Sequence, residues 1–322
     1  MKQENPLISI ICAVRNDERF IRETLDSVVL QSYKNWELVV MDGASTDKTV
    51  EILNEYAVKH KNITVVSEPD KGQWHALDKA LALTRGEYLF QLCGQDGYLD
   101  NDWFKRCVET FEKHPDVSLV WGIPFNMSED GKLLGPHYAY AKFLRDKRYG
   151  GQTRPISTIV SKAGIHDAST ALRLLRLVRK LTPHRVWVVL RSFWKQDIPQ
   201  KEKWFYYWLK TCHSFPEQNM CMRKDVYVRN TTRFPKETMT NSALFDFTFN
   251  FNSKGYLAYG LPLAGNFSRM HVGRQDLRKF DTELTESYNK KVADFRNKLK
   301  DQKTVKFLDH NDKVVLESDQ KI

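Results

Sequence analysis

The first hundred residues contain three short, almost continuously apolar segments, and each of them ends in a polar turn. The segments span Leu7–Val14, Trp36–Met41 and Glu87–Leu92. Apolar runs of this length, bounded by turn residues, are typical of strands that are buried on both faces of a parallel sheet. The turns that follow contain Asp17, Asp42 and Asp96, respectively. The pattern therefore predicts three buried strands whose carboxyl ends carry acidic groups.

Amphipathic helices are predicted around these strands, because apolar residues recur there with the 3.6-residue period of a helix face. They span residues 18–31, 46–59 and 72–84. Ser45 or Thr46 is expected to cap the second helix, with Asp47 in its first turn, where an acid suits the helix dipole. A short strand is predicted at residues 63–67. The alternation of strands and helices indicates an α/β protein with an open, mostly parallel sheet.

The aspartate-containing turns lie where such sheets bind their ligands. In open parallel sheets, ligands occupy the crevice at the carboxyl ends of the strands. We therefore expect a site for a small, polar and phosphorylated molecule at this edge. The carboxylate of Asp42 suits contact with the N–H and hydroxyl donors of a base or ribose, and the alternative is a turn-forming role. For Asp47 we favour the role of a helix cap.

The middle of the chain combines a basic helix with clustered aromatic residues. Residues 171–181 would place four basic side chains on one helical face and leucines and valines on the other, and aromatic clusters follow, among them Trp204–Trp208. This pattern is typical of an element that lies at a membrane surface. We predict such a contact for residues 171–208. The alternative is a pair of helices packed over the neighbouring site, with the arginines simply solvated.

Composition narrows the class of protein. Fifty Lys and Arg residues face 40 Asp and Glu residues, which gives a net charge of +10, and residues 141–210 are especially basic. A local excess of positive charge favours a negatively charged partner. Nucleic acid is disfavoured, because no nucleic-acid-binding module is found and the basic residues cluster around apolar ones.

Cysteine usage and the termini bear on the cellular compartment. The five cysteines lack CxxC spacing, so we expect free thiols rather than disulfides or a zinc site. No apolar run reaches the ~20 residues of a membrane span, and residues 1–6 lack a signal-peptide pattern. We expect a cytoplasmic protein, peripheral on the inner face of the plasma membrane.

Ordered polar motifs lie at the strand ends and helix starts of the first third. They are Ser9-Ile10-Ile11, Val14-Arg15-Asn16, Met41-Asp42-Gly43-Ala44-Ser45-Thr46-Asp47, Ser67-Glu68-Pro69-Asp70-Lys71-Gly72, Ala76-Leu77-Asp78-Lys79-Ala80 and Arg85-Gly86-Glu87-Tyr88. Together they resemble the opening of family 2 glycosyltransferases, with weaker similarity as far as Gly273. The resemblance implies a GT-A fold, which is a Rossmann-like, mostly parallel sheet flanked by helices. It also implies a nucleotide-sugar donor, a divalent metal ion and inversion at the anomeric carbon.

On this resemblance the chain divides into three parts. Residues 1–130 form a donor-binding half, and residues 131–275 form an acceptor-binding half with a helical, basic and aromatic insertion at about 165–212. Residues 276–322 form a charged C-terminal helix and tail. The helix is expected at residues 284–300, either solvated or self-associating.

The resemblance also implies the donor-site residues. Nucleotide contacts are expected from Val14, Arg15, Asp42, Asp70, Lys71, Gly72, Asp78 and Gln95. Arg15 either touches phosphate or shapes its turn. Asp96 is the expected carboxylate ligand of Mg²⁺ or Mn²⁺, with His271 as a second ligand, whereas the alternatives are a turn former and a surface histidine. Relatives usually carry two adjacent acids here, or a DxD arrangement, but Gln95 precedes Asp96 in this chain.

The acceptor side offers two candidates for the catalytic base. Asp246 matches the second acid of a family Asp-Tyr-Asp-Leu-Trp motif, and Leu244 replaces the first acid. Glu217 lies in a segment that resembles a family Pro-Gln-Glu motif with two residues exchanged. The alternative for Asp246 is an ion pair or helix cap. Arg223 and Lys224 match basic family positions and are expected to bind diphosphate or acceptor, unless they are strand-edge charges.

Two functions follow from these residues. The first is an inverting, metal-dependent glycosyltransferase that moves a sugar from a UDP-sugar to a hydroxyl of a cell-surface glycan or lipid-linked oligosaccharide precursor. The second is a catalytically impaired relative that binds a nucleotide sugar or serves as a scaffold, suggested by Gln95, Gln218 and Leu244. The oligomeric state is left open.

Overall fold

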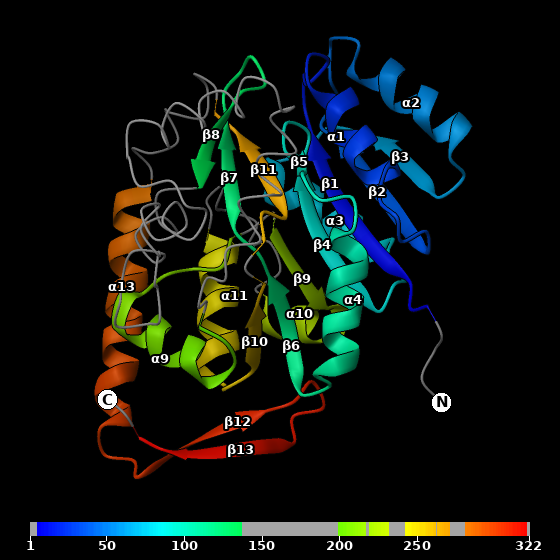
Figure 1. Cartoon of the computed structure of the whole chain (residues 1–322). Helices are drawn as coiled ribbons and strands as arrows, with labels where there is room; N and C mark the ends of the chain where they lie inside the picture. The colour runs from blue at the N-terminus through cyan, green and yellow to red at the C-terminus, as the bar shows by residue number, and fades with distance from the viewer. Residues whose placement is uncertain are drawn as a thin grey trace, which may run out of the picture.

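A computed structural model of the chain describes residues 5–136, 199–216, 219–231, 242–261, 263–270 and 281–320. Its centre is a seven-stranded sheet with the strand order β10-β6-β9-β4-β1-β2-β3 (Figure 1). The strands are β1 (Ile8–Val14), β2 (Trp36–Asp42), β3 (Ile63–Ser67), β4 (Tyr88–Cys93), β6 (Val117–Trp121), β9 (Met220–Arg223) and β10 (Leu257–Gly260). Only β9 runs antiparallel to its neighbours in this sheet. The predicted α/β class with a mostly parallel sheet is confirmed.

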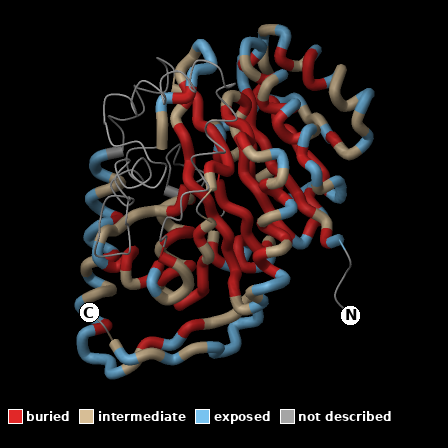
Figure 2. The backbone as a smooth tube through the Cα atoms, viewed as in Figure 1, coloured by how far each residue is buried: buried red, intermediate tan, exposed pale blue. Residues whose placement is uncertain are grey.

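The central strands are buried on both faces, as their continuous apolar sequences predict. All residues of β1 and β2 are buried. Successive β1 side chains point to opposite faces. Ile11 belongs to one apolar cluster with Leu77, and Ile10 belongs to the other with Leu25. Figure 2 shows this buried sheet as the core of the described chain, with exposed segments around it.

Helices cover both faces of the sheet. They are α1 (Ile21–Val29), α2 (Thr49–Lys59), α3 (Gln73–Ala82), α4 (Trp103–Lys113), α9 (Glu202–Thr211), α10 (Lys224–Asn230), α11 (Ser242–Ser253) and α13 (Asp281–Leu299). The three predicted N-terminal helices are confirmed, with shorter ends. Helix α2 begins at Thr49 with Lys48 at its N-cap, so the predicted cap at Ser45 or Thr46 is wrong. Ser45 instead donates a hydrogen bond to Asp42.

A second sheet extends from the carboxyl end of β4. It has the order β5-β11-β7-β8, formed by β5 (Gly97–Tyr98), β7 (Pro124–Met127), β8 (Leu133–Pro136) and β11 (Asn266–Arg269). A turn at residues 130–132 joins β7 to β8, with Gly131 at a φ of 82°. Because β5 follows β4 directly, the turn that contains Asp96 lies where the two sheets meet.

The C-terminal part corrects one expectation. Helix α13 is close to the predicted helix, but the expected polar tail is a β-hairpin of β12 (Thr304–Leu308) and β13 (Val314–Asp319). Val305 and Phe307 are buried, and the Phe307 ring packs edge-on against Phe205 at 5.3 Å. These two apolar residues at alternate positions pack β12 against the core. In the sequence they stand between charged residues, so the alternation is hard to recognise.

The aromatic cluster at residues 204–208 corrects another expectation. Trp204 and Trp208 of α9 are 1% and 0% exposed, and Trp204 stacks on Phe215. The predicted membrane contact is therefore wrong for this helix, whose rings fill the protein core. The basic segment 171–181 and most of the insertion lie outside the described residues. Among the helices that the structure describes, none is both long and apolar enough to cross a bilayer.

Candidate functional site

The central sheet has a topological switch point between β1 and β4. The chain proceeds from β1 through β2 to β3 on one side and returns to place β4 on the other side of β1. Ala13 pairs with Cys93 at the carboxyl ends, and the Gly94 N–H donates to the Ala13 carbonyl at 3.2 Å. Such a point opens a crevice in which α/β proteins bind ligands. The predicted site residues should therefore lie near the carboxyl ends of these strands.

Several predicted nucleotide-binding residues converge on Gly43. The Gly43 N–H donates to the Val14 carbonyl at 2.9 Å, which ties the end of β1 to the turn after β2. A Cβ at Gly43 would lie 2.7 Å from the Asp70 carboxylate and 3.4 Å from Cδ of Arg15. Only glycine allows this close approach, because a methyl group would displace the Asp70 side chain. Val14, Arg15 and Asp70 thus meet around one backbone position.

The Asp42 carboxylate is buried and fully engaged within the protein. It is 1% exposed and accepts hydrogen bonds from the Ser45 N–H at 2.9 Å, from the Ser45 hydroxyl, and from the Ser67 hydroxyl at 2.7 Å. In this arrangement Asp42 shapes the turn after β2. Contact with a base or ribose would require one serine hydroxyl to move, and it stays a prediction.

Asp70 also orders the start of α3. Its carboxylate accepts the Gly72 N–H at 2.7 Å, and Gly72 takes a φ of 110° at the N-cap of the helix. The Lys71 N–H donates to Nδ1 of His75 at 3.0 Å, and Lys71 itself is exposed to solvent. The predicted segment 70–72 therefore lies beside Gly43, with an exposed cation.

The turn between β4 and β5 places Gln95 and Asp96 in different environments. Asp96 is 0% exposed, and its Oδ1 accepts the backbone N–H of Arg269 at 3.0 Å. Gln95 is half-buried, and its Nε2 donates to Oδ1 of Asp17 at 2.5 Å. The residue that faces outward at this turn is thus the amide, not the carboxylate to which the sequence assigned the metal.

Asp17 is a site residue to which the sequence analysis gave no role. It is 5% exposed, accepts the Arg15 N–H at 3.3 Å, and lies against Gly94, where a Cβ would come within 2.3 Å of Oδ2. Burial raises the pKa of Asp17, although hydrogen bonds from Gln95 and Arg15 oppose the shift. Its position in a polar turn directly after β1 was the only sequence signal, and Gln95 lies 78 residues away.

The oxygen atoms at this edge fit a hard divalent cation. Carboxylates and amide oxygens are suitable ligands for Mg²⁺ or Mn²⁺, and substrate phosphates and water complete such sites. Asp17, Gln95 and Asp96 supply these groups within two turns. No group of three or more His, Cys, Asp or Glu suited to a metal occurs among the described residues. His271 lies outside the described residues, two positions after Arg269.

The family model for glycosyl transferase family 2 matches residues 9–182, which is more than half of the chain. The chain belongs to glycosyl transferase family 2. The turns around Gly43 and Gln95 both fall inside the matched region.

Known bacterial proteins are similar over part of this chain. Chondroitin synthase of Pasteurella multocida is 29% identical over 142 residues, which cover 44% of this chain and 15% of that protein. The putative glycosyltransferase EpsE of Bacillus subtilis is 34% identical over 117 residues, 36% of this chain and 42% of EpsE. These matches therefore span less than half of each relative's length.

One solved structure shares the fold. Residues 1–349 of S. aureus TarS, in complex with UDP-GlcNAc, superpose with a TM-score of 0.53 at 15% identity. The match covers 91% of this chain and 72% of the TarS chain. It confirms the GT-A type of architecture predicted for this family 2 chain.

The acceptor-side candidates are only partly described. Asp246 lies on α11 and forms an ion pair with Nζ of Lys291 on α13 at 3.0 Å. Their side chains are 31% and 54% exposed, so the pair faces solvent. This is the ion-pair arrangement that the sequence left as an alternative. Glu217 lies outside the described residues.

Arg223 and Lys224 lie at the other end of the strands, near the beginning of β4. Arg223 pairs with Tyr88, the first residue of β4, and its guanidinium bonds Glu87 and the Val117 carbonyl. Lys224 donates to the Thr84 carbonyl, and burial lowers the pKa of its ammonium group. A diphosphate site that joins these two residues to the Asp70 edge is therefore wrong. Because β9 runs antiparallel, its end meets the beginning of β4.

Asp78 lies in the middle of α3, six residues after Gly72 at the N-cap. It lines a cavity of about 20 Å³ with Trp74 of α3 and Tyr227 of α10. A space of this size holds about one water molecule, not a nucleotide. The predicted nucleotide contact of Asp78 has no support in this geometry.

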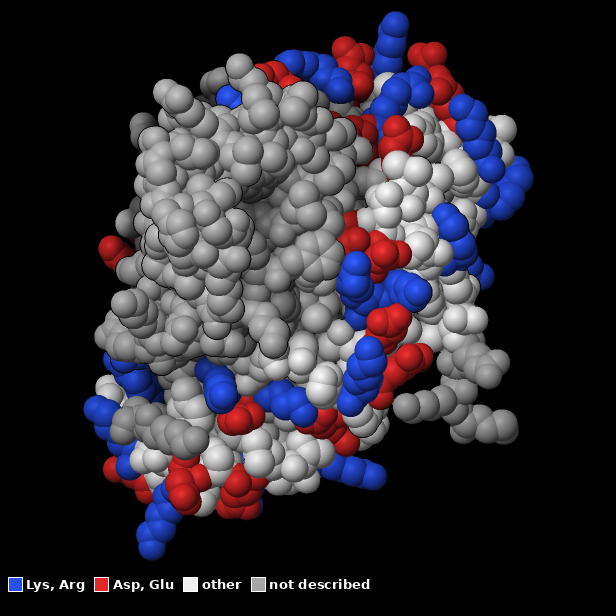
Figure 3. All heavy atoms as spheres, in the orientation of Figure 1, with Lys and Arg blue, Asp and Glu red and all other residues white. Residues whose placement is uncertain are grey.

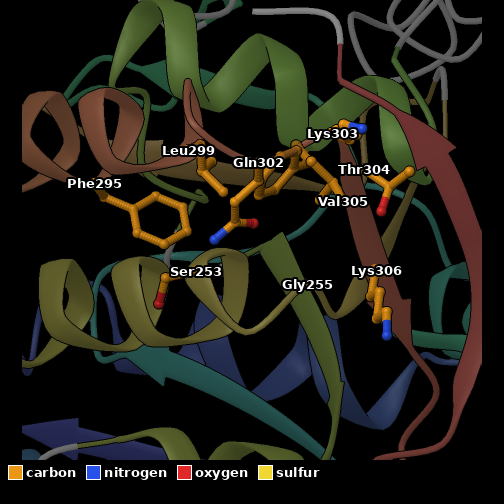
Figure 4. Close-up of a pocket in the computed structure, with 10 residues that line it drawn as sticks. Ser253, Gly255, Phe295, Leu299, Gln302, Lys303, Thr304, Val305 and Lys306 are labelled. Atoms are coloured by element: carbon orange, nitrogen blue, oxygen red, sulfur yellow. The ribbon is translucent and has the colours of Figure 1, made fainter.

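A larger cavity lies far from these turns. It is an open pocket of about 430 Å³ between α11, α13 and β12, and Phe295, Gln302 and Lys306 are among its lining residues (Figure 4). None of the predicted site residues line it.

On the face shown in Figure 3, Lys and Arg alternate with Asp and Glu over the described surface, so this part carries no single-sign patch.

Proposed function

We propose that this chain is an inverting glycosyltransferase that transfers a sugar from a nucleoside-diphosphate donor to a hydroxyl group. The observation that carries the proposal is the convergence of Val14, Arg15 and Asp70 on Gly43 beside the β4–β5 turn. Family membership supports the reaction class. A UDP-sugar is the proposed donor, because the TarS structure with the same fold contains UDP-GlcNAc.

The chain's own residues suggest a division of labour. Asp70 and the turn around Gly43 would bind the nucleoside, and Asp42 would support this turn from within the protein. The exposed Lys71 would lie near the diphosphate. Gln95 and Asp96 would hold Mg²⁺ or Mn²⁺, with His271 as a further ligand. When bound, the metal would neutralise charge that develops on the departing diphosphate.

The acceptor hydroxyl needs a base that removes its proton as the sugar is transferred. Glu217 and Asp246 are the two proposed bases. To act in this way, the Asp246 carboxylate must exchange its bond to Lys291 for a bond to the hydroxyl. A positioned base contributes about 10²–10⁴-fold in rate.

The proposed acceptor is a cell-surface glycan or a lipid-linked oligosaccharide precursor. Relatives that include chondroitin synthase and hyaluronan synthase of Pasteurella multocida support a glycan acceptor. We also propose that residues 171–180 contact the inner face of the plasma membrane, on the strength of their basic amphipathic pattern. Deletion of this segment should weaken flotation with anionic vesicles. Unchanged flotation would contradict the membrane proposal alone.

A second candidate is a family member that binds a nucleotide sugar without turnover. Two observations favour it, namely the amide of Gln95 at the metal turn and the ion pair that engages Asp246. Thermal shift with UDP-sugars, with and without Mn²⁺, tests donor binding, because a bound ligand raises apparent stability. Release of UDP from the donor tests turnover. Binding with no UDP release would favour the second candidate, and no binding of any nucleotide sugar would contradict both.

A further inference from the structure

Hydrogen bonds hold the backbone of Asp17, and Gly94 lies against its side chain. Its backbone N–H donates to Oγ1 of Thr49 at 2.8 Å, and its carbonyl accepts the N–H groups of Phe20 and Ile21 at the start of α1, both at 2.9 Å. Gly94 closes the other side, since a Cβ there would clash with Oδ2. Asp17 therefore offers its carboxylate to Gln95 from a rigid frame.

This contact dictates which end of the Gln95 amide faces outward. A carboxylate only accepts hydrogen bonds, so the NH₂ group of the amide must point at Asp17. The observed bond runs from Nε2 of Gln95 to Oδ1 of Asp17 at 2.5 Å. The carbonyl oxygen, Oε1, must then point away from Asp17. An isolated glutamine would present either end with similar ease.

Exposure shows why the orientation matters at this turn. From Cys93 to Tyr98, only Cys93 and Gln95 are partly exposed, whereas Gly94, Asp96, Gly97 and Tyr98 are buried. Oε1 of Gln95 is therefore the side-chain oxygen best placed to meet a molecule in the crevice. It lies beside β1 and β4, at the switch point.

Charge explains why an amide is tolerated in place of an acid. Asp17 and Asp96 are both buried carboxylates, and a carboxylate at position 95 would lie within hydrogen-bond distance of the Asp17 carboxylate. Like charges at this distance oppose each other strongly. The amide removes that repulsion and retains an oxygen ligand, while the negative charge stays behind it on Asp17.

We infer that Asp17 is a positioning residue that orients Gln95, so that Oε1 of Gln95 contacts the metal and diphosphate end of the donor. This inference rests on the proposed function. It names the group that replaces the missing acid in this chain. It also means that a residue in another turn, 78 positions earlier, determines the orientation of the Gln95 amide.

A charge-relocation cycle tests the inference. The variants are Asp17→Asn, Gln95→Glu and the double variant. In the double variant, the new amide at position 17 can donate a hydrogen bond to the new carboxylate at position 95. This restores the bond with its direction reversed. Binding of inorganic pyrophosphate with Mn²⁺, and of uridine alone, is measured by calorimetry, and thermal unfolding confirms that each variant is folded. Asp47→Asn is the matched control, because it removes a charge from a neighbouring turn and leaves the Gln95 contact intact.

Each single variant should weaken pyrophosphate binding about tenfold, a typical coupling for side chains in contact. The double variant should return to within about threefold of the wild type. Uridine binding and the control should stay unchanged, which a general loss of structure would not produce.

Additive losses in the double variant would overturn the inference, as would unchanged pyrophosphate binding in all three variants of a chain that binds UDP. Both results leave the proposed function intact. A wild-type chain that binds neither pyrophosphate nor UDP would instead refute the proposed function, and the inference with it.

Discussion

The backbone N–H of Arg269 donates to the carboxylate of Asp96 across 3.0 Å, which fastens the end of β11 to the β4–β5 turn. The Arg269 guanidinium, 2% exposed, lies over the Phe20 ring and bonds Glu23 of α1. Arg269 thus links the buried Asp96 to the start of α1, which joins three distant parts of the sequence. Asp96 is held as part of the framework and is also the expected metal carboxylate.

Asp96→Ala should abolish metal-dependent turnover, because it removes a proposed metal ligand and the acceptor of the Arg269 N–H. Donor turnover with Mn²⁺ is the measurement. Asp96→Asn is the matched control for folding, since it keeps an oxygen for Arg269 but lacks the charge, and it should unfold near the wild-type temperature with at least about 100-fold lower activity. Normal turnover by either variant would show that the metal assignment is wrong.

Gly43→Ala should weaken UDP binding about tenfold, because the new methyl group would lie 2.7 Å from the Asp70 carboxylate and displace it. Calorimetric titration with UDP measures the effect. Ala44→Gly alters the same turn, at a residue with a φ of 54°, and should leave UDP affinity unchanged. Equal affinity of Gly43→Ala and the wild type would remove Asp70 from the nucleotide site.

Asp246→Asn should lower kcat by about 10²–10⁴-fold if Asp246 is the acceptor base. Lys291→Ala breaks the same ion pair and should change the free energy of unfolding by less than about 1 kcal/mol, because the pair is solvent-exposed. Steady-state kinetics of both variants separate the two roles. A full-rate Asp246→Asn enzyme would leave Glu217 as the base.

Glu37→Gln should destabilise the protein at neutral pH but not in acid. Burial acts to raise the pKa of Glu37, yet hydrogen bonds from the Arg85 N–H, the Ser9 hydroxyl and the Arg85 guanidinium outweigh it and hold the pKa below its usual 4.5. A lowered pKa gives stability that is present above 4.5 and lost as the pH falls through the folded-state value.

Urea unfolding of Glu37→Gln and the wild type at several pH values measures this dependence. The difference in free energy of unfolding should be about 1 kcal/mol at pH 7 and should shrink below pH 4.5. Glu51→Gln, at an exposed position on α2, should show no such dependence. A difference that is constant with pH would contradict the assignment of the stability to the Glu37 carboxylate.

Some of the site was visible in the sequence because its signals are local. The runs from Leu7 to Val14 and from Trp36 to Met41 predicted buried strands, and strand direction alone put Val14 and Asp42 at the same end of the sheet. The motif around Asp70 and Gly72 marked a helix start, which the structure confirms. The C-terminal hairpin was missed, because its apolar residues, among them Val305 and Phe307, are short groups between charged residues.

The amino-acid sequence by itself determined the α/β class, the glycosyltransferase family and the strand-end turns, because hydrophobic period and short polar motifs are properties of neighbouring residues. The tertiary structure decided which of those residues meet. It moved Arg223 and Lys224 to the far edge, since β9 is antiparallel, and packed Trp204 and Trp208 into the core. It also joined Asp17 to Gln95. That contact forms because β4 pairs with β1. A pairing between strands so far apart in the chain cannot be recognised from the residues of either strand alone.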